Sequence, residues 1–121
     1  MPDDGDLYQY KATVLKAYDG DTCTLSIDVG FHISIEEQVR LYGIDTPEMR
    51  SNSSIEKDMA RAARDELRKL VNKEVTIITH KQGKYGRYLV DIYYGDEHIN
   101  KKLIDMGLAR EYYGGKKEPW F

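Results

Sequence analysis

The chain has little of what would build a disulfide framework or a membrane anchor. Cys23 is the single cysteine among 121 residues, so no intrachain disulfide can form and packing must supply the stability. Its place in an alternating strand favours a small buried core residue over a reactive thiol. No apolar run approaches the ~20 residues of a membrane-spanning helix, so we expect one globular domain with no membrane contact.

Three common kinds of catalytic site are also missing from the sequence. The three histidines, His32, His80 and His98, lie on separate elements without the spacing of a zinc site. The sequence contains no glycine-rich phosphate loop and no Ser-His-Asp arrangement. We therefore assign the histidines no role and expect none of the chemistries that depend on such sites.

The N-terminal residues 1–6 are acidic and lack the basic and apolar regions of a signal peptide. Two alternatives stay open for the location of the protein. It is cytoplasmic if this N-terminus is native, and it is secreted if the chain is a trimmed mature form.

Charge is unevenly distributed along the chain. The net charge is −3, which by itself argues against a nucleic-acid partner. Acidic residues outnumber basic ones over residues 1–50, however, and the reverse holds over residues 51–121. We therefore expect a local positive groove and modest affinity, in place of the strong non-specific binding of a chromatin protein.

Hydrophobic alternation predicts a series of strands. The clearest is residues 22–29, in which the odd-numbered positions are apolar and the even-numbered ones are polar. The acidic pair Glu36-Glu37 interrupts the next alternation and predicts a bulge or bend there. The expected strands span residues 10–18, 22–29, 31–41, 75–80 and 88–94.

Helical patterns follow the third and the fifth of these strands. Ser53 and Glu56 fit a capping box, with Ser53 as the N-cap and Glu56 reaching back to it. A second, short helix covers residues 100–106 and ends at Gly107. Five strands with a helix after the third match the order of an OB-fold barrel, which is an α+β fold.

Three turns carry charges that folding alone does not explain. They are Asp19-Gly20-Asp21-Thr22, the segment from Arg40 to Asp45-Thr46-Pro47-Glu48, and Lys84-Tyr85-Gly86-Arg87. Carboxylates can ligate a hard cation or act as a base, and arginines can bind a phosphate. Metal-assisted cleavage of a phosphodiester needs these groups together.

Each turn also has an ordinary structural explanation. Asp and Gly are favoured in hairpin turns, and Glu48 is explained equally well as a surface acid after a proline. Both arginines can be read as surface charges. Arg40, however, lies inside an apolar strand, where an arginine usually has a partner.

The order of these three turns resembles the thermonuclease (staphylococcal nuclease-like) family. The resemblance implies a five-stranded OB-fold barrel with about three helices over residues 10–113, a tail at residues 1–9 and another at 114–121. It implies one calcium ion per domain, held by Asp21, Asp45 and the backbone carbonyl of Thr46. Asp19 would lie nearby and orient water.

The resemblance also implies roles for the other charged residues. Glu48 would be the general base, while Arg40 and Arg87 would stabilise the charge on the phosphate, and Arg87 would also assist the leaving oxygen. The implied substrate-binding residues are Lys84, Tyr85 and Tyr113.

The implied function is calcium-dependent hydrolysis of phosphodiester bonds in DNA, and in RNA as well, leaving 3′-phosphate ends. The resemblance implies a monomer that prefers single-stranded substrate. Two alternatives stay open: a weak or inactive domain of the same fold that binds nucleic acid or a protein partner, and an unrelated OB-type single-strand binder. The presence of both acidic turns and both arginines favours the enzyme.

The sequence departs from the family pattern in several places. Gly83 replaces an acidic residue, and Gly115 stands where some members carry tyrosine. The connection between the second and third strands is longer than in the best-known member of the family, and the loop after Glu48 is shorter than in that member. None of these differences removes a catalytic group. We expect the tail lysines, Lys116 and Lys117, to have no part in turnover.

Overall fold

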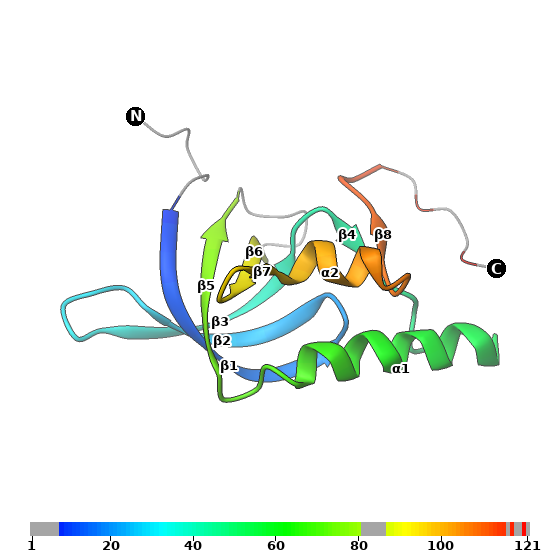
Figure 1. Ribbon diagram of the computed structural model, residues 1–121, viewed down its shortest axis with the longest axis horizontal. Coiled ribbons are helices and arrows are strands. Elements are labelled where there is room, and N and C mark those ends of the chain that lie inside the picture. The colour runs from blue at the N-terminus through cyan, green and yellow to red at the C-terminus, as the bar shows by residue number, and fades with distance from the viewer. Residues whose placement is uncertain (1–7, 81–86, 116, 118–119, 121) are drawn as a thin grey trace.

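A closed five-stranded barrel forms the centre of the computed structural model, which describes residues 8–80, 87–115, 117 and 120 (Figure 1). Neighbouring strands pair antiparallel in the order β3-β2-β1-β5-β6, and a parallel pairing of β3 with β6 closes the sheet. This is the OB-fold architecture that the sequence predicts. The barrel strands are β1 (Tyr8–Asp19), β2 (Thr22–Asp28), β3 (Ser34–Leu41), β5 (Glu74–Thr79) and β6 (Tyr88–Tyr94).

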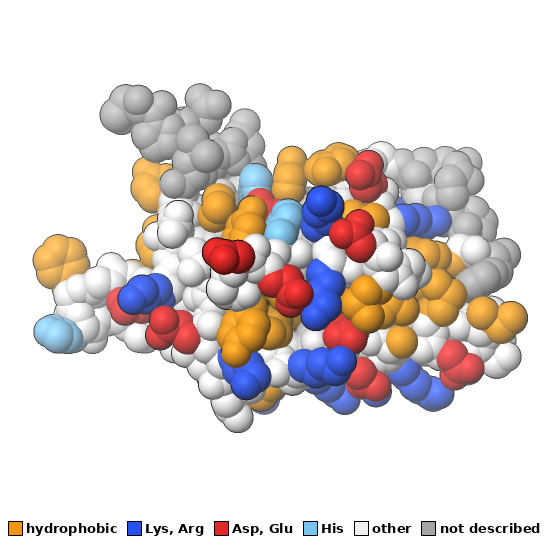
Figure 2. All heavy atoms as spheres, viewed as in Figure 1, with side chains coloured by type: hydrophobic (Ala, Val, Ile, Leu, Met, Phe, Trp, Pro, Cys, Tyr) orange, Lys and Arg blue, Asp and Glu red, His pale blue; other side chains and the backbone are white. Residues whose placement is uncertain are grey.

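Short elements complete the structure around the barrel. The described residues contain two α-helices, where the resemblance implied about three, and neither is long and apolar enough to cross a membrane. On the face shown in Figure 2, acidic and basic side chains intermingle over α1. The remaining elements are β4 (Ile44–Asp45), α1 (Ser54–Arg68), β7 (Glu97–His98), α2 (Ile99–Asp105) and β8 (Arg110–Glu111).

The core consists of the inward-facing apolar side chains of the barrel and one face of each helix. Cys23 is fully buried in it, which confirms that this residue is a core residue. Burial raises the pKa of its thiol to about 12, so the group stays protonated at neutral pH. The largest fully buried side chains are Leu25, Leu41, Ile44, Leu67, Ile77, Ile92 and Leu103.

The bulge expected at Glu36-Glu37 is absent. The pairing of β2 with β3 runs from Thr22 opposite Arg40 to Asp28 opposite Ser34 without a shift in register. The register shifts lie in β1 instead, where that strand pairs with β2. The outer half of β3 projects beyond the barrel (Figure 1), so acidic side chains there can face solvent without a bend.

The start of α1 is capped as predicted, but the capping glutamate bonds elsewhere. Ser53 Oγ accepts a hydrogen bond from the Glu56 N–H at 3.3 Å. The Glu56 carboxylate does not reach back to Ser53; it accepts bonds from the Glu48 N–H and the Ser51 hydroxyl, both at 2.9 Å. The helix end therefore holds the loop that follows the second acidic turn.

Buried Asn100 joins α2 to the barrel beside that same turn. Its amide nitrogen donates to the carbonyl oxygens of Tyr42 and Val90, at 2.9 and 3.1 Å, and its amide oxygen accepts from the Ile92 N–H at 3.0 Å. These bonds satisfy backbone groups at the end of β3 and in β6. The end of β3 is thereby fixed in place.

The first acidic turn packs directly against α1. A Cβ atom on Gly20 would lie 2.5 Å from Ala63 Cβ and 2.9 Å from Thr46 Cγ2. Such contacts are too short for carbon atoms, so the turn can approach the helix this closely only with glycine at that position.

We predict that Gly20→Ala will lower the free energy of unfolding by about 1–3 kcal/mol, because the added methyl group overfills this contact. Urea denaturation measures the change. The same substitution in an Ala63→Gly background should cost less, because space is returned. An equal cost in both backgrounds would contradict the packing explanation.

Candidate active site

One arginine lies between two buried carboxylates at the end of the barrel. Arg40 Nη2 is 3.4 Å from Asp21 Oδ2 and 3.6 Å from Asp45 Oδ1, and the Asp21 and Asp45 residues are 6% and 3% exposed. Asp21 Oδ2 also accepts a long hydrogen bond, 3.4 Å, from the Thr46 N–H. The structure therefore brings together the two acidic turns and Arg40, as expected from the sequence.

Two further basic side chains contact the Asp45 carboxylate, and the sequence did not place either of them in the site. Arg110 donates to Asp45 Oδ2 from both Nε and Nη2, at 3.3 and 3.1 Å, and its position opposite Asp45 in the β4–β8 pairing explains the contact. Lys117 Nζ lies 3.0 Å from Asp45 Oδ1. This contact counts against the expectation that Lys117 has no part in turnover, which stays a prediction, while Lys116 lies outside the described residues.

The carboxyl groups of Asp19 and Asp21 are coupled and their pKa values move apart. Burial, followed by a hydrogen bond to Asp21 and repulsion from its charge, raises the pKa of Asp19 to about 7. Burial also opposes ionisation of Asp21, but the bond from Asp19, the charge of Arg40 and the Thr46 N–H together lower its pKa. Asp21 is thus the ionised member of the pair.

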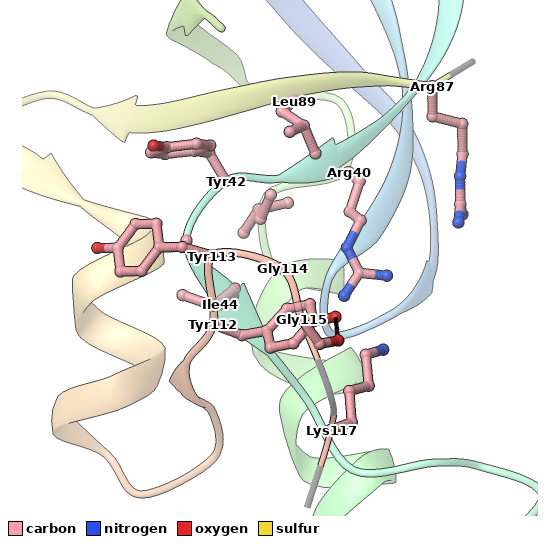
Figure 3. Close-up of a pocket in the computed structure, with 12 residues that line it drawn as sticks. Arg40, Tyr42, Ile44, Arg87, Leu89, Tyr112, Tyr113, Gly114, Gly115 and Lys117 are labelled. Atoms are coloured by element: carbon pink, nitrogen blue, oxygen red, sulfur yellow. Dashed lines mark hydrogen bonds between the residues drawn. The ribbon is translucent and has the colours of Figure 1, made fainter. Parts of the chain in front are cut away.

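A cavity of about 680 Å³ opens beside these charges. Arg40 lines it from β3, Arg87 from the residue before β6, and Tyr113 and Lys117 from the segment after β8. Figure 3 shows the guanidinium groups of Arg40 and Arg87 on the same side of this cavity. Within the described part of the chain, Arg40 Nη2 is buried and lacks a hydrogen-bond partner.

Aromatic rings form another wall of the cavity. The ring of Tyr42 stacks on His80 with centroids 3.8 Å apart and meets the edge of Tyr113 at 5.5 Å. Gly43 makes room for Tyr113, because a Cβ at that position would lie 2.9 Å from its ring. His80 in turn contacts the Asp91 carboxylate at 2.7 Å. The sequence did not indicate that Tyr42 lines the cavity, because its stacking on His80 joins segments far apart in the chain.

Not every residue expected in the site reaches the cavity. Glu48 is exposed on the turn after Pro47 and does not line the cavity, so its role as a base stays a prediction. Lys84 and Tyr85 lie outside the described residues. Within the described ranges, no three His, Cys, Asp or Glu side chains are close enough to form a ready-made metal site.

The fold and the site together define an OB-fold domain in which two acidic turns meet at Arg40, while Arg40 and Arg87 line a neighbouring cavity. A family model described as "Staphylococcal nuclease homologue" matches residues 38–119. The chain is 35% identical over 100 residues to the thermonuclease of Staphylococcus intermedius, and 34% identical over 100 residues to that of Staphylococcus hyicus. Both matches cover 80% of this chain and 56% of the relative.

A plant relative is also similar, although over less of its length. The staphylococcal-like nuclease CAN1 of Arabidopsis thaliana is 32% identical over 76 residues, which are 62% of this chain and 22% of that protein. The chain spans about half the length of the two thermonucleases it matches. It belongs to the staphylococcal nuclease family.

The raised pKa of Asp19 predicts a pH dependence for the metal-free protein. A carboxyl group whose folded-state pKa is raised adds stability at low pH, and this contribution is lost as the pH rises from about 4 to about 7. Relative to wild type, Asp19→Asn should therefore be more stable, with a larger free energy of unfolding, at about pH 8 than at about pH 5. Urea denaturation with a chelator present measures it.

The matched control for this measurement is Asp58→Asn. Its side chain is 77% exposed on α1, so the substitution removes a carboxylate without touching the site. Its stability relative to wild type should be the same at both pH values. If Asp19→Asn also shows the same difference at both, the Asp19 carboxyl does not titrate as described.

Proposed function

We propose that the chain is a calcium-dependent nuclease that hydrolyses phosphodiester bonds in DNA and RNA and leaves 3′-phosphate ends. The observation that carries this proposal is the buried Arg40 Nη2, which lacks a hydrogen-bond partner among the described residues and lies next to the cavity. Its ion-pair partners Asp21 and Asp45 lie at 3.4 and 3.6 Å without hydrogen-bond geometry, so this N–H still needs an acceptor. A phosphate oxygen is the acceptor that the planar fork of arginine suits best.

The donor atoms around Arg40 suit a hard cation. Asp21 and Asp45 offer two buried carboxylates, and Thr46 would add a backbone carbonyl, which is the oxygen chemistry that calcium prefers. Asp19 would lie beside the ion and orient a water molecule. When bound, calcium would polarise a phosphoryl oxygen and lower the pKa of a nearby water.

The remaining steps belong to side chains of this protein. Glu48 takes the proton of the attacking water as its oxygen bonds to phosphorus, and the bond to the 5′ oxygen breaks on the opposite side. Arg40 and Arg87 stabilise the negative charge that grows on the phosphate. Arg87 also assists the departing 5′ oxygen. Lys84, Tyr85 and Tyr113 would contact the rest of the nucleotide.

The exposed position of Glu48 favours a second candidate function. A base that does not line the cavity can reach the substrate only if its turn moves. The backbone of this turn is held, because the Glu56 carboxylate accepts hydrogen bonds from the Glu48 N–H and the Ser51 hydroxyl. A domain in which Glu48 never reaches the phosphate would be weak or inactive as an enzyme and would only bind nucleic acid or a protein partner.

Digestion of a short single-stranded DNA and of the matching RNA separates these functions. We expect the purified chain to cleave with calcium present and to stop when a chelator is added. Products should carry 3′-phosphate and 5′-hydroxyl ends. If the chain binds the oligonucleotides but does not cleave them, either with calcium or with a chelator present, the second function is supported instead.

We predict that Glu48→Gln will lower turnover by at least ~10²-fold and leave oligonucleotide binding nearly unchanged, because the amide keeps the size of the side chain but cannot take a proton. Single-turnover cleavage and a separate binding titration measure the two effects. Glu97→Gln, whose side chain is 50% exposed on β7, is the control and should cleave normally. Normal cleavage by Glu48→Gln would reject Glu48 as the base.

A further inference from the structure

The carboxylate of Asp45 is paired with cations at both of its oxygens. Arg110 binds Oδ2, while Lys117 Nζ lies 3.0 Å from Oδ1 and Arg40 Nη2 lies 3.6 Å from the same atom. The Asp45 side chain is 4% exposed, so solvent screens these charges weakly. An oxygen that already contacts two cations cannot approach a dication closely unless one of them moves away.

Lys117 is the cation that can leave most easily. Arg40 is held in the barrel wall and also contacts Asp21, and Arg110 is held by the β4–β8 pairing and lies 4.5 Å from the ring of Trp120. The Lys117 side chain is 39% exposed and has a flexible stem, with a compact charge that water solvates well. Lys117 Nζ also lies 5.1 Å from the centre of the Tyr112 ring.

The place to which Lys117 can move is the same cavity. Lys117 lines this cavity together with Arg40 and Arg87. Figure 3 shows its side chain extending from the end of the chain toward the guanidinium of Arg40. A short shift of Nζ away from Asp45 would leave the amine at the cavity wall, where the two arginines already make the surroundings positive.

We propose that Lys117 is an exchangeable cation of the site: it neutralises Asp45 in the metal-free chain and binds a substrate phosphate once a metal ion has taken Asp45. This inference rests on the proposed function. It predicts that Lys117 has opposite effects on the affinities for the metal and for the phosphate. Lys117 weakens metal binding to the free protein, because it must be displaced, and it strengthens phosphate binding to the metal-loaded protein. Lys117 therefore couples the two ligands positively.

Calorimetric titrations of the Lys117→Met variant test both consequences, because methionine keeps the length of the stem and removes the charge. Calcium should bind this variant about 3- to 10-fold more tightly than wild type when no oligonucleotide is present, the scale of one partly exposed ion pair. A 5′-phosphorylated trithymidylate should bind the calcium-saturated variant about 3- to 10-fold more weakly, measured with Glu48→Gln also present in every protein so that the oligonucleotide is not cleaved. Lys117→Arg should restore the binding of trithymidylate.

The matched control is Lys101→Met, which removes the same charge from an exposed position on α2 and should leave both affinities unchanged. If both affinities fall in Lys117→Met, the residue only supports the local structure and the inference is wrong. Unchanged affinities also overturn it. If wild type itself binds no calcium, the proposed function fails as well, which distinguishes that failure from a failure of Lys117 alone.

Discussion

The parallel pairing of β3 with β6 is the constraint on which the rest of the site depends. It closes the barrel and sets Arg40 opposite Leu89, so an arginine is fixed in the barrel wall at the open end of the core. Arg87 is brought to the same end because it directly precedes β6. The antiparallel partner β2 begins beside Asp21, and the turn after β3 returns the chain at Asp45. These two pairings and the turn after β3 thus bring Asp21 and Asp45 to one guanidinium.

A cluster of buried charges lowers the stability of a small domain, because each charge loses its hydration. Ion pairs taken out of water rarely add net stability, whereas removing one partner of such a pair is costly. Here the repulsion between carboxylates is reduced by the raised pKa of Asp19 and by the three cations around Asp45. The other buried side chains of the described residues are neutral, and most of them are apolar, so they need no such compensation. A charge cluster of this kind at the rim of a cavity is what the binding of charged ligands would require, and stability gives no reason for it.

Local patterns in the sequence predicted much of the structure. The alternation of apolar and polar residues predicted the barrel strands, and Ser53 correctly marked the start of α1, because both signals act within a few residues. The convergence of Asp21, Asp45 and Arg40 was predictable from the resemblance of three turns to one family. Arg110 and Lys117 were not, because an isolated cation near the C-terminus has no spacing signal. Their contacts with Asp45 depend on β8 crossing back to β4, which only the folded chain shows.

We infer that the two acidic turns form a cation site in this chain. Calorimetric titration of calcium into wild type, Asp21→Asn and Asp58→Asn tests it most directly, with circular dichroism to confirm that each variant is folded. We expect a single calcium per chain for wild type and for Asp58→Asn, and an affinity for Asp21→Asn lower by at least ~10-fold, since a charged ligand is lost. Equal affinities in all three proteins, or no calcium uptake by wild type, would contradict it.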